Sequence, residues 1–92
     1  MEIEYLRELL VLAEKENFSE AADVLYTTQS TLSKHIKKIE LELGVPLFDR
    51  TSRKVKINEF GQTFIPFAKQ ITDIRNHYED VLQSKLATDR DT

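Results

Sequence analysis

The feature that most limits how this chain can fold is a seven-residue repeat of large apolar side chains in its last third. The repeat advances by four and three residues in turn and consists of Phe60, Phe64, Phe67, Ile71, Ile74, Tyr78 and Val81. Held over about three heptads, such a repeat is typical of a coiled-coil seam. The repeat predicts a helix over residues 59–87, and the part from Glu59 to Leu86 alone would be roughly 42 Å long. The rest of a 92-residue chain is too small to cover it. A second copy of the helix is therefore the expected cover, and these are the predicted dimerisation residues.

The preceding segment has the pattern of three short helices. Apolar residues at helical spacing predict one helix from Ile3 to about Glu16, with Asn17 as its stop. Ser19 is the candidate N-cap of a second helix that ends near Tyr26, and Thr28 is the expected N-cap of the third. The third helix is expected to end at a glycine, Gly44.

The third helix divides into an apolar and a polar side. Leu32, Ile36, Ile39 and Leu43 fall on one narrow stripe, which we expect to be buried. The opposite side is small, polar and basic, and no acidic residue precedes Glu40. His35 lies near the edge of the stripe and is predicted to pack.

A β-hairpin is predicted to follow the third helix. Arg53, Val55 and Ile57 alternate with two lysines, which is a two-residue period, and residues 47–50 supply the other arm. Asn58 is the expected cap of the last helix, and Pro66 should kink that helix locally. The fold class predicted is mainly α: a winged helix-turn-helix of three helices and a two-stranded wing over residues 1–58, then a long dimerisation helix over 59–87. Residues 88–92 are expected to form a disordered tail.

Composition and charge exclude several classes of function. The chain has no cysteine, which rules out disulfides and thiolate metal sites. No apolar run approaches the length of a membrane span and no leader pattern opens the chain, so a cytoplasmic protein without membrane contact is expected. The net charge is −3, yet residues 34–56 hold seven basic and three acidic side chains. This local excess suits a phosphate backbone, although from charge alone a merely solvated surface is slightly favoured.

Taken together, the motifs resemble the LysR-type transcriptional regulators of bacteria. The resemblance is dense up to about residue 61 and looser in the last helix. It is carried by Phe18-Ser19, Ala21-Ala22-x-x-Leu25, Thr28-Gln29, Ser33, Ile36-Lys37-Lys38, Ile39-Glu40, Leu43-Gly44, Leu47-Phe48-x-Arg50, Arg53, Val55, Ile57 and Gly61. Four positions depart from the family pattern: Ser30 replaces a proline, Asn58 a threonine cap, Phe60 a small residue and Asn17 a common serine.

The resemblance implies sequence-specific binding of double-stranded DNA by a homodimer. The third helix is expected to enter the major groove and the wing to approach the minor groove, at an inverted-repeat operator with an A/T-rich flank. The DNA-binding residues predicted from position and resemblance are Thr28, Gln29, Ser30, Thr31, Ser33, Lys34, Lys37, Arg53 and Lys54. Family members usually continue into an effector-binding domain. We expect that domain to be absent from this chain. A small-molecule effector would act only through the missing domain.

Individual roles differ within this set. Gln29, Ser30, Ser33 and Lys34 are expected to read bases, with Lys37 at phosphate. Thr28 is first an N-cap, and Lys38 points away from the binding face. Arg53 is the candidate for the minor groove, with Lys54 at most a backbone contact. Arg50 either contacts DNA or forms an internal pair with Glu40, and the pair is favoured.

Two other function classes compete with DNA binding. An acidic helical dimer could serve as a protein-interaction module, but this leaves the basic outer face of the third helix unexplained. An enzyme is disfavoured because there is no glycine-rich phosphate loop, and His35 and His77 lack matched carboxylate partners in the sequence pattern. No cofactor and no metal are expected.

Overall fold

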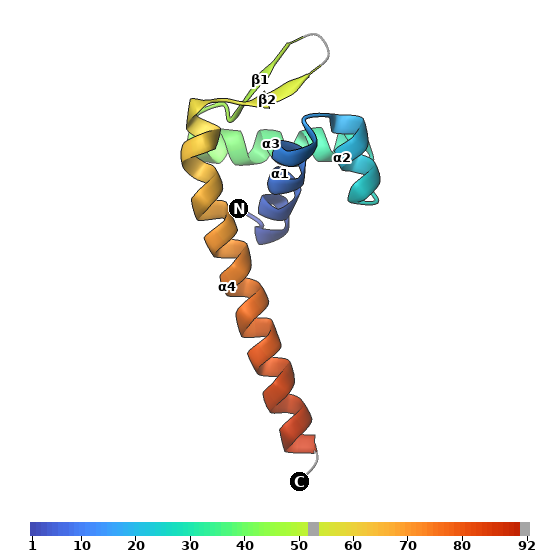
Figure 1. Ribbon diagram of the computed structural model, residues 1–92, viewed down its shortest axis with the longest axis vertical. Coiled ribbons are helices and arrows are strands. Elements are labelled where there is room, and N and C mark those ends of the chain that lie inside the picture. The colour runs from blue at the N-terminus through green and yellow to red at the C-terminus, as the bar shows by residue number, and fades with distance from the viewer. Residues whose placement is uncertain (52–53, 91–92) are drawn as a thin grey trace.

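The elements follow one another with short connections. The computed structural model describes residues 1–51 and 54–90. In chain order its elements are α1 (Ile3–Lys15), α2 (Phe18–Val24), α3 (Gln29–Leu43), β1 (Phe48–Arg50), β2 (Val55–Ile57) and α4 (Glu59–Arg90), as drawn in Figure 1. The predicted fold class is confirmed: three helices and a two-stranded antiparallel wing precede one long helix.

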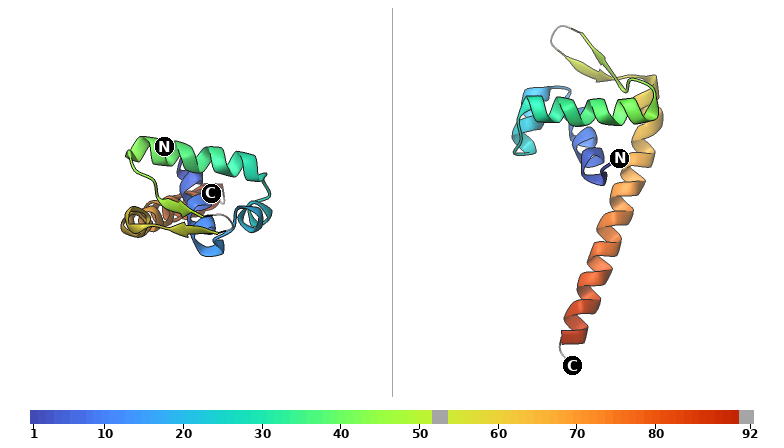
Figure 2. Two further views of the ribbon diagram at one scale, coloured as in Figure 1. Left: turned by 90° about the horizontal axis from the view of Figure 1, so that it is seen from above. Right: turned by 180° about the vertical axis from the view of Figure 1, so that it is seen from behind.

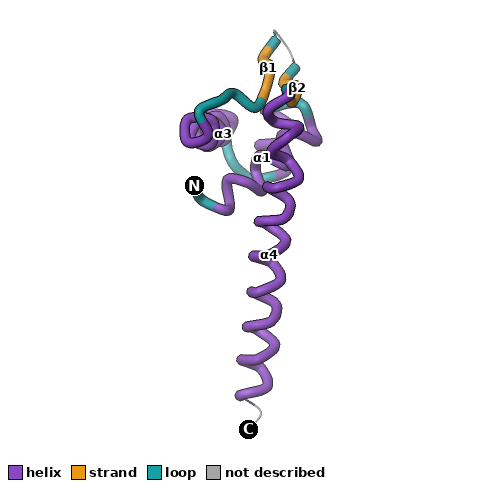
Figure 3. The backbone as a smooth tube through the Cα atoms, turned by 90° about the vertical axis from the view of Figure 1, so that its left-hand side faces the viewer, coloured by secondary structure: helices purple, strands orange, loops and turns teal. Residues whose placement is uncertain are grey.

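The long helix gives the molecule its shape. α4 has 32 residues and its second half extends beyond the small domain, so that the principal extents are 59 × 25 × 19 Å. Figure 2 shows α4 projecting from one end of the domain in the view from behind, and Figure 3 shows α3 almost end-on beside it. The helix continues through Pro66 without interruption.

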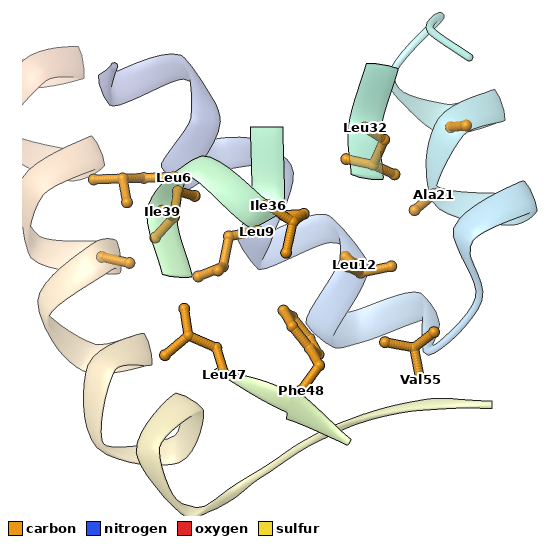
Figure 4. Close-up of a cluster of buried hydrophobic side chains, with 12 residues drawn as sticks. Leu6, Leu9, Leu12, Ala21, Leu32, Ile36, Ile39, Leu47, Phe48 and Val55 are labelled. Carbon is orange, nitrogen blue, oxygen red and sulfur yellow. The ribbon is translucent and has the colours of Figure 1, made fainter. Parts of the chain in front are cut away.

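One core holds the domain together (Figure 4). α1, α3 and the residue before β1 contribute its largest fully buried side chains: Leu6, Leu9, Leu12, Leu32, Ile36, Ile39 and Leu47. Ala21 and Ala22 are also buried, which lets α2 approach α1 and α3 closely, as their small size predicted. Full burial of one such leucine or isoleucine contributes about 1.5–3 kcal/mol, so this cluster is the main stabilising feature of a small domain.

Two helix boundaries differ from those predicted. The left-handed residue that ends α1 is Glu16, at φ 54°, and not Asn17. Asn17 is instead the N-cap of α2, because its side-chain oxygen accepts the Glu20 N–H at 2.9 Å. The prediction that Ser19 caps this helix was wrong, since Ser19 lies inside it. The caps at Thr28, Gly44 and Asn58 are confirmed.

Two further expectations at helix ends need correction. Leu43 was predicted to be buried but is 37% exposed, because it is the last residue of α3, next to the chain reversal at Gly44. The long helix was predicted to end at residue 87, but α4 reaches Arg90. No glycine or proline stops it there, and the Thr88 hydroxyl donates to the Ser84 carbonyl at 3.0 Å within the helix. The remainder of the predicted tail, residues 91–92, lies outside the described part of the chain.

The wing is a short hairpin tied to the domain on both sides. β1 and β2 pair antiparallel, with Phe48 opposite Ile57 and Arg50 opposite Val55. The Val55 N–H donates to the Glu16 carbonyl at 3.3 Å, which joins β2 to the end of α1. On the other side, the Glu40 carboxylate accepts the Leu47 N–H at 2.7 Å. The wing therefore has a fixed position relative to α3.

His35 has a carboxylate partner that the sequence pattern did not indicate. Its Nδ1 lies 2.8 Å from the Glu8 carboxylate in α1, and its ring stacks on Tyr5 with centroids 4.0 Å apart. The Glu8 residue is only 8% exposed. His35 thus packs as predicted, and in addition it satisfies a buried acid between α1 and α3.

Replacing His35 with alanine is expected to lower the free energy of unfolding by about 2 kcal/mol, because the buried Glu8 carboxylate would lose its partner. Part of the full penalty for breaking a buried pair is screened, since the His35 side chain is 23% exposed. Urea unfolding followed by circular dichroism measures the change. His77→Ala, at an exposed position of α4, is the control, and equal effects of the two substitutions would contradict the role of the pair.

Candidate nucleic-acid interface

The first three turns of α3 present a polar surface. Gln29, Ser30, Lys34 and Lys37 are exposed, whereas Thr31 and Ser33 are half-buried. Leu32, Ile36 and Ile39 hold the opposite side of the helix in the core. The predicted base-reading and phosphate-binding side chains of α3 are thus brought together on one outward side. Their roles remain predictions.

Thr28 fixes the start of this surface. Its hydroxyl oxygen accepts the Thr31 N–H at 3.1 Å, and the hydroxyl donates to the Thr31 side chain at 3.0 Å. A cap of this kind is worth about 1 kcal/mol. The Thr28 hydroxyl group thus accepts one hydrogen bond and donates another, which establishes its structural role as an N-cap. A contact with a DNA phosphate would have to share the same hydroxyl group.

Two of the basic side chains of the wing, Arg50 and Lys54, differ in their surroundings. Arg50 donates to Glu40 at 3.2 Å and its guanidinium lies 5.6 Å from the centre of the Phe18 ring. The favoured internal pair is therefore present. Lys54 is exposed. Arg53, predicted for the minor groove, lies outside the described residues, so that assignment stays a prediction from the sequence.

Lys38 belongs to another side of α3. Its ammonium nitrogen lies 6.0 Å from the centre of the Tyr5 ring in α1, a weak cation–π contact. This placement agrees with the expectation that Lys38 points away from the polar surface formed by Gln29, Ser30, Lys34 and Lys37.

The predicted seam of α4 is mostly open to solvent. Phe60, Phe67, Ile71, Ile74, Tyr78 and Val81 are all exposed, and Ile74 is the most exposed of them, at 64%. Phe64 differs, because it packs partly against the domain core. The apolar surface continues past the predicted seam through Leu82 and Leu86. A large exposed apolar surface is typical of an interaction site, and the assignment of these residues to dimerisation remains a prediction.

A second side of α4 was missed by the sequence reasoning. Gly61, Ala68 and Thr72 are buried and Ile65 is partly buried where α4 packs on the domain. These positions also recur at intervals of four and three residues, but three of the side chains are small or polar. The sequence signal for this buried side was the small size of the residues, which allows close helix packing, and not their hydropathy.

Charged contacts extend this packing along α1. Arg75 donates to the Glu4 carboxylate at 3.1 Å, and the same carboxylate accepts from Arg7 at 3.2 Å. Beyond Arg75 the helix leaves the domain. Within residues 1–51 and 54–90, no cluster of three or more potential metal ligands occurs and no helix is long and apolar enough to cross a membrane.

Comparison with known protein families gives a consistent result. The family model described as bacterial regulatory helix-turn-helix protein, lysR family, matches residues 3–62. An uncharacterized HTH-type transcriptional regulator of Bacillus subtilis strain 168, YxjO, is 38% identical over 74 residues. That alignment covers 80% of this chain and 25% of YxjO. The chain thus spans about a quarter of the length of this relative.

Solved structures extend the similarity to the long helix. The crystal structure of the BenM_DBD/catB site 1 DNA complex has a TM-score of 0.87 at 31% identity, covering 95% of this chain and 94% of that one. The CbnR_DBD–DNA complex has a TM-score of 0.86 at 26% identity, covering 92% of this chain and 98% of that one. Both similar structures are complexes with DNA.

Proposed function

This chain belongs to the LysR family of bacterial regulatory helix-turn-helix proteins, and we propose that it binds double-stranded DNA sequence-specifically as a homodimer. In this proposal α3 enters the major groove and the wing lies at the adjacent minor groove. The family consists of transcriptional regulators and not of enzymes. We also infer a cytoplasmic location, since the bacterial chromosome lies there. A small-molecule effector would require a part of the longer relatives outside this chain.

The observation that carries the proposal is the exposed, acid-free surface over the first three turns of α3. A recognition helix reads base edges with side chains near its N-terminus while adjacent groups hold phosphates. Gln29, Ser30 and Lys34 have that position and are free to reach base edges. Lys37, one turn further along, suits a phosphate. Thr31 and Ser33, being half-buried, would contribute at the edge of this surface.

The homodimer follows from the open apolar surface of α4. Two copies related by a two-fold axis would cover the exposed seam residues, from Phe60 to Val81, and present two recognition helices. Such a dimer matches an operator whose half-sites form an inverted repeat. Arg53 is proposed for the minor groove, where narrow A/T-rich tracts attract arginine, and Lys54 for the backbone.

A fluorescence-anisotropy titration with pooled random-sequence duplexes, followed by sequencing of the bound fraction, tests the proposal. Binding that weakens with salt and enriches an inverted repeat with an A/T-rich flank is the expected result. Absence of binding even at low salt would overturn it, and an interaction module built on the α4 surface would then be the better account.

Gln29→Ala is expected to weaken binding to the selected operator by about 1–3 kcal/mol and to relax discrimination at one or two base pairs. The reason is that a glutamine amide can bond a base edge, adenine above all, with both of its groups. Titrations against the operator and against a random duplex separate the two effects. Gln83→Ala, on exposed α4 surface, is the matched control. An equal loss on both duplexes would show that Gln29 does not read bases.

A further inference from the structure

A cleft separates the recognition helix from the wing. It has a volume of about 420 Å³ and lies where the start of α2, the first turn of α3 and the turn end of the wing, at Arg50 and Val55, meet. Its exposed polar lining comprises Ser19, Gln29, Arg50, Thr51 and Lys54. No acidic side chain is among the described residues that line it, although the whole chain has a net charge of −3. The described lining therefore carries two basic side chains, of which Arg50 is paired with Glu40.

The walls of this cleft are joined to one another. The Val55 N–H donates to the Glu16 carbonyl at 3.3 Å, which holds the wing beside the turn between α1 and α2. Arg50 bridges the same gap, since it pairs with Glu40 of α3 and stacks over Phe18 of α2. The distance between α2 and the wing is thus set by the fold and not by a ligand.

The position of the cleft has a consequence for DNA binding. In duplex DNA a sugar–phosphate strand separates each major groove from the adjacent minor groove. If α3 occupies the major groove and the wing occupies the minor groove, that strand must pass between them, over this cleft. We propose that a DNA phosphate binds in the cleft, held by the Lys54 ammonium group and by hydroxyl hydrogen bonds from Ser19 and Thr51. This inference rests on the proposed function, and it adds Ser19 and Thr51 to the backbone contact already proposed for Lys54.

Ser19 is the informative residue of the three. Within the described part of the chain its hydroxyl group has no hydrogen-bond partner, whereas the Glu20 N–H beside it is taken by the Asn17 side chain. The proposed contact is therefore made by side chains and does not depend on the end of α2. Hydroxyl groups commonly position a protein on the DNA backbone without reading sequence.

Two substitutions at Ser19 test the proposal against a pooled random-sequence duplex and a selected operator. Ser19→Ala is expected to weaken binding to both by roughly fivefold, since one hydrogen bond is lost. The salt dependence should stay unchanged, because no cation is removed. Ser19→Asp is expected to weaken binding at least tenfold more than Ser84→Asp, which adds the same charge at an exposed site on α4.

Folding does not confound this comparison. An acidic residue in the first turn of a helix suits the helix dipole, so Ser19→Asp should unfold at the same temperature as the unsubstituted protein. If the unsubstituted protein binds DNA but Ser19→Asp and Ser84→Asp bind equally well, the phosphate site is wrong and DNA binding stands. If the unsubstituted protein fails to bind at low salt, both proposals fall.

Discussion

Ile74→Glu is expected to convert the protein from a dimer into a folded monomer and to weaken its binding to an inverted-repeat operator by about 100-fold or more. Ile74 is 64% exposed in the single chain, so the substitution should leave the domain intact. In a two-fold dimer the same substitution enters the interface from both chains and buries two like charges. The loss of affinity follows from the loss of simultaneous binding to two half-sites, an effect worth about 100- to 10,000-fold in avidity.

Two measurements separate assembly from DNA contact in this experiment. Sedimentation velocity gives the oligomeric state, and anisotropy titrations compare the inverted repeat with a single half-site. Half-site binding by Ile74→Glu should match that of the unsubstituted protein, since no DNA-contacting residue changes. Gln83→Glu is the control, because it places the same charge on α4 about 140° around the helix from Phe60, away from the seam. A dimer that persists in Ile74→Glu would refute the α4 interface.

The architecture could be predicted because its signals are local. Helix spacing, the caps at Thr28, Gly44 and Asn58, and the two-residue alternation of the wing each depend on residues close together in sequence. The cap that was misplaced shows the limit of such signals. Asn17 and Ser19 are both good capping residues, and the choice between them depends on where α1 ends. It ends at Glu16, which has a left-handed conformation although glutamate does not favour one.

Contacts between distant residues could not be predicted in the same way. The Glu8–His35 pair joins positions 27 residues apart, and nothing near either residue marks the other. The cleft beside Ser19 likewise depends on how closely the wing approaches α2. The exposed side of α3, in contrast, could be predicted from helical periodicity, because a helix with one buried stripe must expose the opposite side.

The orientation of α4 was hidden by the size of the residues that determine it. The large side chains of the seam dominate any hydropathy pattern, yet within residues 59–88 the buried positions belong to another side of the helix, at Gly61, Ala68 and Thr72. Small residues contribute little to a periodicity, but they permit the helix to approach α1 and the wing. The consequence is that the seam points away from the domain, which leaves it available to a second copy.

Gly61→Ala is expected to lower the free energy of unfolding by about 3 kcal/mol and the melting temperature by about 10–20 °C. Helix propensity alone predicts the opposite sign, because alanine in place of glycine stabilises a helix interior by about 1 kcal/mol. Packing reverses this. A Cβ at position 61 would overlap both the Leu47 carbonyl oxygen and the Ile57 side chain. The Leu47 carbonyl cannot readily yield, since it accepts the Asn58 N–H at 2.9 Å at the junction of wing and helix.

Thermal unfolding followed by far-UV circular dichroism measures this change, and Gln62→Ala, one residue further along on the exposed surface, supplies the control. A rise in melting temperature for Gly61→Ala would show that α4 does not approach the wing as closely as the structure indicates. The expected loss has a functional corollary. Relief of the overlap requires α4 to move away from β1 and β2, which would change the spacing between the two recognition helices of a dimer. The folded fraction of Gly61→Ala should therefore lose more affinity for an inverted repeat than for a single half-site.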